Sequence, residues 1–346
     1  MGLYKNLRVT AIINETADTK TFVLEPKTPA DNFAYEAGQF LTLVFHRPFG
    51  EERRSFSISS SPALNEPLMV TVKRVENGAY SRILLDKGIV GDEWQTIGAS
   101  GFFVLPPSLN PYRQIFFFAA GSGITPVFSL IKTVLFTEPN VDVVLIYSNR
   151  NISTTIFYKE LSLLLSRFPT RFKIEFLFST APNLARARLS KWLLEILLNE
   201  YKTDANEECL FYLCGPYEYM RMASIGLVAN GIAEKNIHKE DFIPLKLEPK
   251  ELPPDKNAYL VFININGETH KIEVQYPETI LSAAKKAGLQ MPYSCEAGRC
   301  GTCVARCTSG KVWMSYNEVL MDDEMAKGLV LTCTGYPVGG DVSLDI

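Results

Sequence analysis

Short runs of alternating or β-rich residues occupy the first part of the chain, and Pro106-Pro107 end this pattern. Clear examples span residues 39–45, 55–59 and 68–75, with turn signals such as Asn77-Gly78 between the runs. Alternation with a period of two is typical of half-buried strands, and repeated short strands of this kind form antiparallel barrels or sandwiches. The pattern therefore predicts an antiparallel β-barrel or sandwich over residues 1–107, and a β-barrel is the fold expected.

The spacing of apolar residues changes from residue 112, where short apolar runs typical of strands alternate with runs of helical periodicity. Expected strands cover 115–120, 141–147, 172–178 and 209–214, and expected helices cover 126–136, 157–165, 189–198 and 217–229. Regular alternation of this kind predicts a parallel sheet with helices on both faces. Residues 112–246 are therefore expected to form an α/β domain.

The last part of the chain predicts a third, smaller domain. Residues 247–257 are rich in Pro, Glu, Lys and Asp, and are expected to be an exposed linker. Two β-rich runs, 260–265 and 269–274, then flank Asn266-Gly267, which is a strong hairpin signal. A helix is expected over 279–287, ended by Gly288. The third domain is expected over residues 258–346.

Composition narrows the class of ligand. The 346 residues carry 35 Lys and Arg against 38 Asp and Glu, a net charge of -3, which argues against nucleic acid as the main partner. No apolar run approaches a membrane span, and the first residues do not resemble a secretory signal. A cytoplasmic location is expected, where seven cysteines are not expected to form a disulfide framework.

Five of these cysteines crowd into the tail, which indicates a metal site. Cys295, Cys300 and Cys303 have the x4-x2 spacing of plant-type [2Fe-2S] sites, and Cys333 supplies the fourth thiolate that two irons need. Gly298 and Gly301 are expected to let the backbone approach the cluster and direct N–H groups at its sulfurs. The alternatives are a structural zinc site, of which only one Cys-x2-Cys half is present, or buried free cysteines.

Cys307 departs from the ligand pattern. It falls in an expected strand, residues 304–308, and is interpreted as a small core residue.

A glycine loop in the α/β domain is a candidate pyrophosphate site. Gly121 and Gly123 follow a strand where the chain turns, Thr125 is expected to N-cap the next helix, and Pro126 is expected to be its first residue. The alternative is a strand-to-helix turn that needs glycine for conformation alone.

A second loop is expected beside the first. Cys214, Gly215 and Pro216 follow the fourth expected strand, and the carboxyl ends of parallel strands share one edge. The alternative for Cys214 is a core residue at the end of a strand.

Two short motifs in the barrel are candidates for flavin binding. Arg54 could pair with phosphate, Phe56 could stack on a ring, and Ser57 could hydrogen-bond a ring nitrogen. Gly78, Tyr80 and Ser81 precede an expected helix over 82–85 and form another candidate pyrophosphate cradle. Each motif alone could equally be surface charge and a barrel aromatic residue.

Taken in order, these motifs resemble the ferredoxin–NADP reductase superfamily. The resemblance implies that Arg54 and Phe56 bind FAD, that Ser57 touches the flavin ring, and that Cys214 lies near the nicotinamide. The segment containing Glu240 and Phe242 resembles the one that closes over the flavin in these reductases. Ser57, Cys214, Glu240 and Phe242 are therefore the expected catalytic residues.

Residues 292–303 closely resemble the cluster loop of plant-type ferredoxins, and that resemblance implies a β-grasp fold. Nearly the whole chain is similar to the reductase subunit of phenylacetyl-CoA epoxygenase and related oxygenase reductases. The expected enzyme takes hydride from NADPH onto FAD and passes single electrons through the [2Fe-2S] cluster to an oxygenase. Other acceptors, such as a desaturase or a cytochrome, fit the same chemistry, and a non-catalytic iron–sulfur redox sensor is a further alternative.

The expected preference for NADPH comes from the end of the second strand of the α/β domain. Ser148 and Arg150 can hydrogen-bond a 2′-phosphate, and no acidic residue follows until Glu160. NADH remains possible, since Arg150 could simply cap a loop in solvent.

Overall fold

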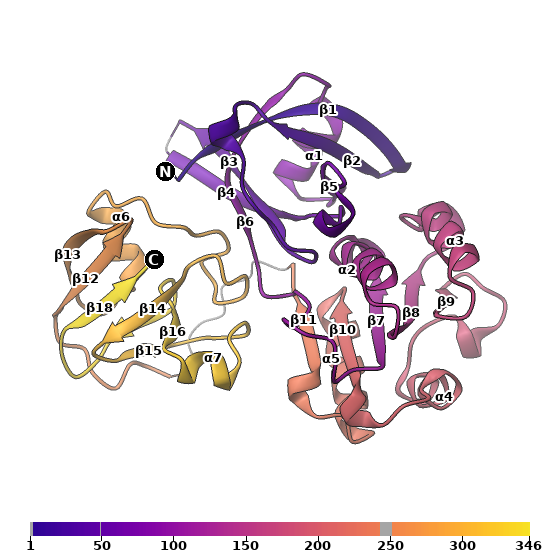
Figure 1. Cartoon of the computed structure of the whole chain (residues 1–346). Helices are drawn as coiled ribbons and strands as arrows, with labels where there is room; N and C mark the ends of the chain where they lie inside the picture. The colour runs from indigo at the N-terminus through magenta and orange to yellow at the C-terminus, as the bar shows by residue number, and fades with distance from the viewer. Residues whose placement is uncertain (1–2, 49, 243–250) are drawn as a thin grey trace.

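The computed structural model describes residues 3–48, 50–242 and 251–346. They form three domains that follow one another along the chain, each built on one main sheet (Figure 1). This arrangement confirms the expected order of an antiparallel domain, a parallel α/β domain and a small β-rich domain. The boundaries 1–107, 112–246 and 258–346 stay a prediction. Residues 247–250 of the expected linker lie outside the described residues.

The first sheet has six antiparallel strands in the order β4-β3-β6-β1-β2-β5. An additional antiparallel bridge joins Ile58, directly after β4, to Val70 in β5 and brings the two edges together. The elements are β1 (Lys5–Thr16), β2 (Thr19–Pro26), β3 (Phe40–Arg47), β4 (Gly50–Ser57), β5 (Leu68–Lys73), α1 (Ala79–Lys87) and β6 (Glu93–Ser100).

Strand β4 differs from the prediction, because it begins at Gly50 and ends at Ser57 instead of covering 55–59. The β3–β4 hairpin explains the earlier start, since Arg47 pairs with Gly50 at the turn.

The second sheet is wholly parallel, in the order β11-β10-β7-β8-β9. Helices α2 and α3 bury apolar residues on one face, and α4 and α5 bury theirs on the other, as predicted. The elements are β7 (Gln114–Ala120), α2 (Ile124–Thr137), β8 (Asp142–Asn149), α3 (Tyr158–Arg167), β9 (Phe172–Phe178), α4 (Lys191–Tyr201), β10 (Cys209–Cys214), α5 (Tyr217–Ala229) and β11 (Ile237–Glu240).

The third domain has a five-stranded sheet in the order β13-β12-β18-β14-β16, with a separate β15–β17 pair. Strands β12 and β18 run parallel, while β12 and β13 form the expected hairpin. The elements are β12 (Tyr259–Ile265), β13 (Glu268–Val274), α6 (Ile280–Lys286), β14 (Val304–Ser309), β15 (Val312–Met314), α7 (Asp322–Ala326), β16 (Leu329–Leu331), β17 (Gly335–Pro337) and β18 (Val342–Asp345).

Single-turn 3-10 helices connect several of these elements, at Pro29–Asp31, Pro62–Leu64, Gly121–Gly123, Ile152–Thr154, Leu184–Arg186, Asn206–Glu208 and Glu234–Asn236. None of the helices in the described part of the chain is long and apolar enough to cross a membrane.

Candidate active site

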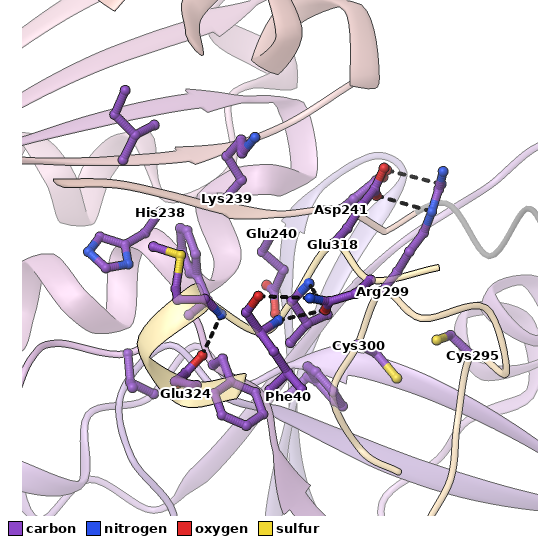
Figure 2. Close-up of a pocket in the computed structure, with 18 of the residues that line it drawn as sticks. Phe40, His238, Lys239, Glu240, Asp241, Cys295, Arg299, Cys300, Glu318 and Glu324 are labelled. Carbon is purple, nitrogen blue, oxygen red and sulfur yellow. Dashed lines mark hydrogen bonds and ion pairs between the residues drawn. The ribbon is translucent and has the colours of Figure 1, made fainter. Parts of the chain in front are cut away.

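A cavity of about 1220 Å³ lies where the three domains meet (Figure 2). Its walls come from β4, from the end of β11 and the residues after it, from the loop before Cys300, and from residues 317–324. Figure 2 shows the thiols of Cys295 and Cys300 toward one side of the view and His238 toward the other. The expected site residues that line this cavity are Arg54, Ser57, Glu240, Phe242, Cys295 and Cys300.

Glu240 is the most perturbed carboxyl group of this cavity. Burial raises its pKa to about 8, and a contact with the Ser57 hydroxyl acts in the opposite direction. Its Oε2 atom is buried without a hydrogen-bond partner of good geometry among the described residues. A protonated carboxyl beside a hydroxyl can donate a hydrogen bond to a bound group. The part of the cavity at Ser57 and Glu240 is therefore suited to bind a polar atom of a ring system.

Cys214 lies on the neighbouring strand and pairs with Glu240 in the sheet register. Its side chain is completely buried, and burial together with the nearby Glu240 charge keeps the pKa of the thiol well above its usual range. Phe242 is 44% exposed, so its ring is available to contact a ligand. The structure thus brings Ser57, Glu240 and Cys214 together, although they come from two domains.

Arg54 lies beside the start of α1, on the opposite side of β4 from Ser57. Its guanidinium lies 4.7 Å from the centre of the Tyr80 ring and pairs with Glu52 at 3.0 Å. Gly78 is the N-cap of α1, so free N–H groups at this helix end lie near Arg54 and could share an anion with it.

Phe56 and Ser81 have other contacts. Phe56 does not line the cavity and packs partly against the barrel core. The buried Ser81 hydroxyl closes the preceding turn, because it accepts from the Val75 N–H at 3.1 Å and donates to the Gly78 carbonyl at 3.3 Å.

The glycine loop differs from the prediction in how the helix begins. The 3-10 turn Gly121–Gly123 runs directly into α2, which starts at Ile124, so Thr125 and Pro126 are its second and third residues. Thr125 is therefore not the N-cap; its hydroxyl donates to the Ser122 carbonyl at 2.8 Å.

Gly123 shows why two separate loops form one site. A Cβ atom there would lie 2.0 Å from the Cys214 carbonyl oxygen, so only glycine permits this approach. Gly215 packs closely against Ala120, and Pro216 caps α5. The two loops are therefore adjacent, as expected from the parallel sheet.

Ser148 and Arg150 lie at the end of β8. The buried Ser148 Oγ and Asn149 Nδ2 lack hydrogen-bond partners of good geometry among the described residues. Arg150 is exposed, and its backbone carbonyl accepts from Thr180.

The cluster cysteines form two pairs. A hydrogen bond between Cys295 and Cys300 lowers the pKa of the Cys295 thiol to about 6, helped by backbone N–H groups of the loop, and it raises the pKa of Cys300. A similar bond joins Cys303 to Cys333 and raises the pKa of Cys303. Within the described ranges, no three His, Cys, Asp or Glu side chains converge on a single-ion site. Two pairs suit two irons with two thiolates each, whereas a structural zinc needs four ligands around one ion.

Gly298 and Gly301 both have positive φ, +71° and +74°, and a Cβ on Gly301 would lie 2.6 Å from the Phe102 ring. In this loop the backbone N–H of Ala297, which sequence reasoning did not single out, donates to Cys295 Sγ at 3.4 Å. Cys307 lies in β14, but it is only partly buried at the edge of the core, and its thiol faces the carbonyls of Ser309 and Gly310.

Sequence reasoning missed the residues that fix the cluster loop, defined here as residues 291–303, against the rest of the molecule. Ser55 Oγ on β4 lies 2.7 Å from Ser294 Oγ, and Ser100 Oγ lies 3.0 Å from Thr302 Oγ1. The buried Arg299 guanidinium pairs with Asp241, just beyond β11, at 3.2 Å (Figure 2). The pair Arg53-Arg54 was the one available signal. Because successive residues of a strand point to opposite faces, these two arginines cannot both face the same site.

Three family models match successive parts of the chain. They describe an oxidoreductase FAD-binding domain over residues 6–104, an oxidoreductase NAD-binding domain over 117–224, and a 2Fe-2S iron-sulfur cluster binding domain over 263–338. The ferredoxin reductase component of 3-ketosteroid-9-alpha-monooxygenase from Rhodococcus rhodochrous is 32% identical over 98% of this chain and 96% of its own length. The chain belongs to the family of ferredoxin–NADP reductase-like oxygenase reductases. It is an oxidoreductase with FAD-, NAD- and 2Fe-2S-binding domains, as the sequence predicted.

A second relative and two solved structures are similar along nearly the whole of this chain. One component of the 1,2-phenylacetyl-CoA epoxidase from Escherichia coli is 31% identical and covers 100% of this chain and 98% of its own. Phthalate dioxygenase reductase, a solved structure, superposes with a TM-score of 0.60 at 23% identity over 99% of this chain and 98% of its own. An intact self-sufficient cytochrome P450 monooxygenase gives a TM-score of 0.75 at 20% identity, covering 99% of this chain but 41% of the larger protein. Both structures support the fold.

Proposed function

We propose that this reductase takes electrons from NADPH onto FAD and passes them singly through its own [2Fe-2S] cluster to a partner oxygenase component. Bound FAD would accept two electrons together and release them one at a time, which is what an iron–sulfur cluster requires. The residues of this chain bind the cofactors, align them and exclude water.

The barrel residues fit FAD. Arg54, with the N–H groups at the start of α1 beside Gly78, Tyr80 and Ser81, provides positive charge and donors for a pyrophosphate. Ser57 and the Oε2 atom of Glu240 would meet polar atoms of the ring, with Phe242 as a proposed aromatic contact. Phe56 stays a proposed flavin contact on the strength of the family resemblance, from the Arg54 side of β4.

The α/β domain fits the nicotinamide nucleotide. The loop of Gly121, Gly123, Thr125 and Pro126 lies against the turn that contains Gly215 and Pro216. The buried Cys214 precedes this turn and pairs with Glu240 in the sheet register. Ser148 and Arg150 would hold the 2′-phosphate of NADPH, because hydroxyl and guanidinium groups both donate to phosphate.

The cluster ligands proposed are the paired thiols Cys295 with Cys300 and Cys303 with Cys333. The hydrogen bonds to Cys295 from the loop backbone favour a thiolate, the form that binds iron.

The observation that carries the proposal is that β4 connects the two redox sites. Ser57 on this strand faces Glu240 at the proposed flavin ring, while Ser55, two residues earlier, contacts Ser294 beside Cys295. The cavity between them is lined by Ser57 and by Cys295 and Cys300. A cofactor held at Ser57 would therefore lie next to the cluster.

The partner is proposed from the relatives. Those relatives are components of 3-ketosteroid-9-alpha-monooxygenase, 1,2-phenylacetyl-CoA epoxidase and glycine betaine monooxygenase systems. We propose an oxygenase of the phenylacetyl-CoA epoxidase type, and a cytoplasmic location, where free cysteines stay reduced.

The Cys300→Ser variant tests the path. It should keep NADPH-dependent ferricyanide reduction, which needs the flavin, and lose cytochrome c reduction, which needs the cluster. Loss of both activities in a variant that retains FAD would contradict a linear path. Retention of both activities would show that electrons reach cytochrome c without passing through the cluster.

A further inference from the structure

Arg53 is an almost fully buried arginine at the boundary between the barrel and the cluster loop. It is 4% exposed, and it neighbours Arg54, the proposed pyrophosphate ligand, but its side chain points to the opposite side of β4. Its Nη1 atom donates to the backbone carbonyls of Met291 at 3.1 Å and Tyr293 at 3.2 Å. Both carbonyls belong to the segment that leads directly into Cys295.

The remaining contacts of this arginine fix its plane. Its guanidinium carbon lies 3.7 Å from the centre of the Tyr293 ring, which is stacking distance. Glu51 on the same strand accepts from its Nη2 at 2.5 Å and its Nε at 2.8 Å. The hydroxyls of Tyr4 and Tyr293 donate to that same carboxylate, at 2.8 Å and 3.2 Å.

This set of contacts requires an arginine. A planar guanidinium can donate to Glu51 and to two carbonyls while its face stacks on an aromatic ring. A lysine ammonium keeps the charge near Glu51, but it has no plane to stack and no fork to span these partners.

We propose that Arg53 is a positioning residue for electron transfer between the flavin and the cluster. It sets the height of the cluster loop above β4, and thereby the distance from the cofactor at Ser57 to Cys295 and Cys300. The Ser55–Ser294 hydrogen bond also holds the loop at this distance from β4, because Ser55 lies between Arg53 and Ser57 and Ser294 directly precedes Cys295. This inference rests on the proposed function.

The position of the loop matters because electron transfer between separate centres depends steeply on their distance and orientation. A small displacement of the loop should therefore slow the transfer step while leaving each cofactor bound. Arg53 lines part of the cavity, but its hydrogen bonds go to Glu51 and to the carbonyls of Met291 and Tyr293. Its replacement should therefore act mainly on electron transfer from the flavin to the cluster and leave flavin reduction by NADPH intact.

The test is anaerobic stopped-flow reduction by NADPH of the intact holoenzyme, following flavin bleaching and cluster bleaching as separate phases. Arg53→Lys should keep flavin reduction within about twofold of wild type and slow the cluster phase by clearly more than that twofold margin. Iron and FAD contents and the electron paramagnetic resonance signal of the chemically reduced cluster should be unchanged. Arg8→Met is the matched control, because Arg8 lies on β1 with a 55% exposed side chain 3.8 Å from Glu93.

A second variant separates positioning from folding. Arg53→Met leaves Glu51 without its cation, which is costly for a partly buried carboxylate, whereas Glu51→Gln with Arg53→Met removes both charges. The double variant should fold, bind both cofactors and still show the slow cluster phase.

An unchanged rate of cluster reduction in Arg53→Lys and in the double variant would overturn the proposal. Equal slowing of flavin reduction and cluster reduction would also overturn it, and so would a loss of iron that parallels the slowing. Failure of NADPH to reduce the cluster in the wild type would instead overturn the proposed function itself.

Discussion

Glu240 should make the stability of the protein fall as pH rises through the neutral range. Its pKa is raised from 4.5 to about 8 by burial, so the folded protein holds a proton there that the unfolded chain has released. Between these two values the folded state binds more protons than the unfolded state, and its free energy of unfolding therefore declines with increasing pH. An aromatic ring bound in the cavity would exclude more water from Glu240 and raise its pKa further.

The size of the effect follows from the two pKa values. Integrating the difference in bound protons from pH 6 to pH 9 gives a loss of roughly 2.5 kcal/mol in the free energy of unfolding from this one carboxyl. Glu240→Gln keeps the shape and the contact with Ser57 but cannot ionise, so this contribution should disappear.

The assay is urea unfolding of wild type and Glu240→Gln at several pH values, compared as the difference between the two proteins. Other titrating groups cancel in that difference, which should change by roughly 2–3 kcal/mol across the range, with Glu240→Gln relatively more stable at high pH. A difference that stays constant from pH 6 to pH 9 would show that Glu240 ionises near its ordinary pKa and would refute the reasoning.

Three further predictions concern the other sites. Iron analysis should show about two irons per chain in wild type and in Cys307→Ser, and loss of iron in serine variants of each proposed ligand; iron retained without Cys333 but lost without Cys307 would reverse the assignment. Arg150→Ala should weaken NADPH binding by about 1.5–3 kcal/mol and leave NADH nearly unchanged in steady-state kinetics, and an equal loss for both would mean that Arg150 does not contact the phosphate. Gly123→Ala should weaken nicotinamide binding by about 1–3 kcal/mol, because the added methyl group forces the loop away from Cys214; unaltered KM values would contradict that packing.

The separate elements of this reductase could be predicted because their signals are local. The parallel sheet follows from apolar runs such as the one in β10, and the cluster loop from the spacing of Cys295, Cys300 and Cys303. The start of α2 was misplaced, since capping rules assign Thr125 to the N-cap and do not anticipate a 3-10 turn that continues into the helix.

The docking of the domains could not be predicted, since its contacts join distant parts of the chain. Arg53 and Tyr293 are 240 residues apart. The charged residues at the start of β4 resemble a solvent-exposed turn in sequence, and only the partners Met291 and Tyr293 explain a buried arginine there. Glu240 illustrates the same point, because it was expected at the site from family resemblance alone, whereas its altered pKa follows from burial between domains.

The most direct test of the central claim is the visible spectrum of the purified protein before and after anaerobic addition of NADPH. We predict overlapping flavin and [2Fe-2S] absorbance in the oxidised protein, and loss of both when NADPH is added. Bleaching of the flavin with the iron–sulfur absorbance unchanged, or a protein without visible absorbance, would contradict the account.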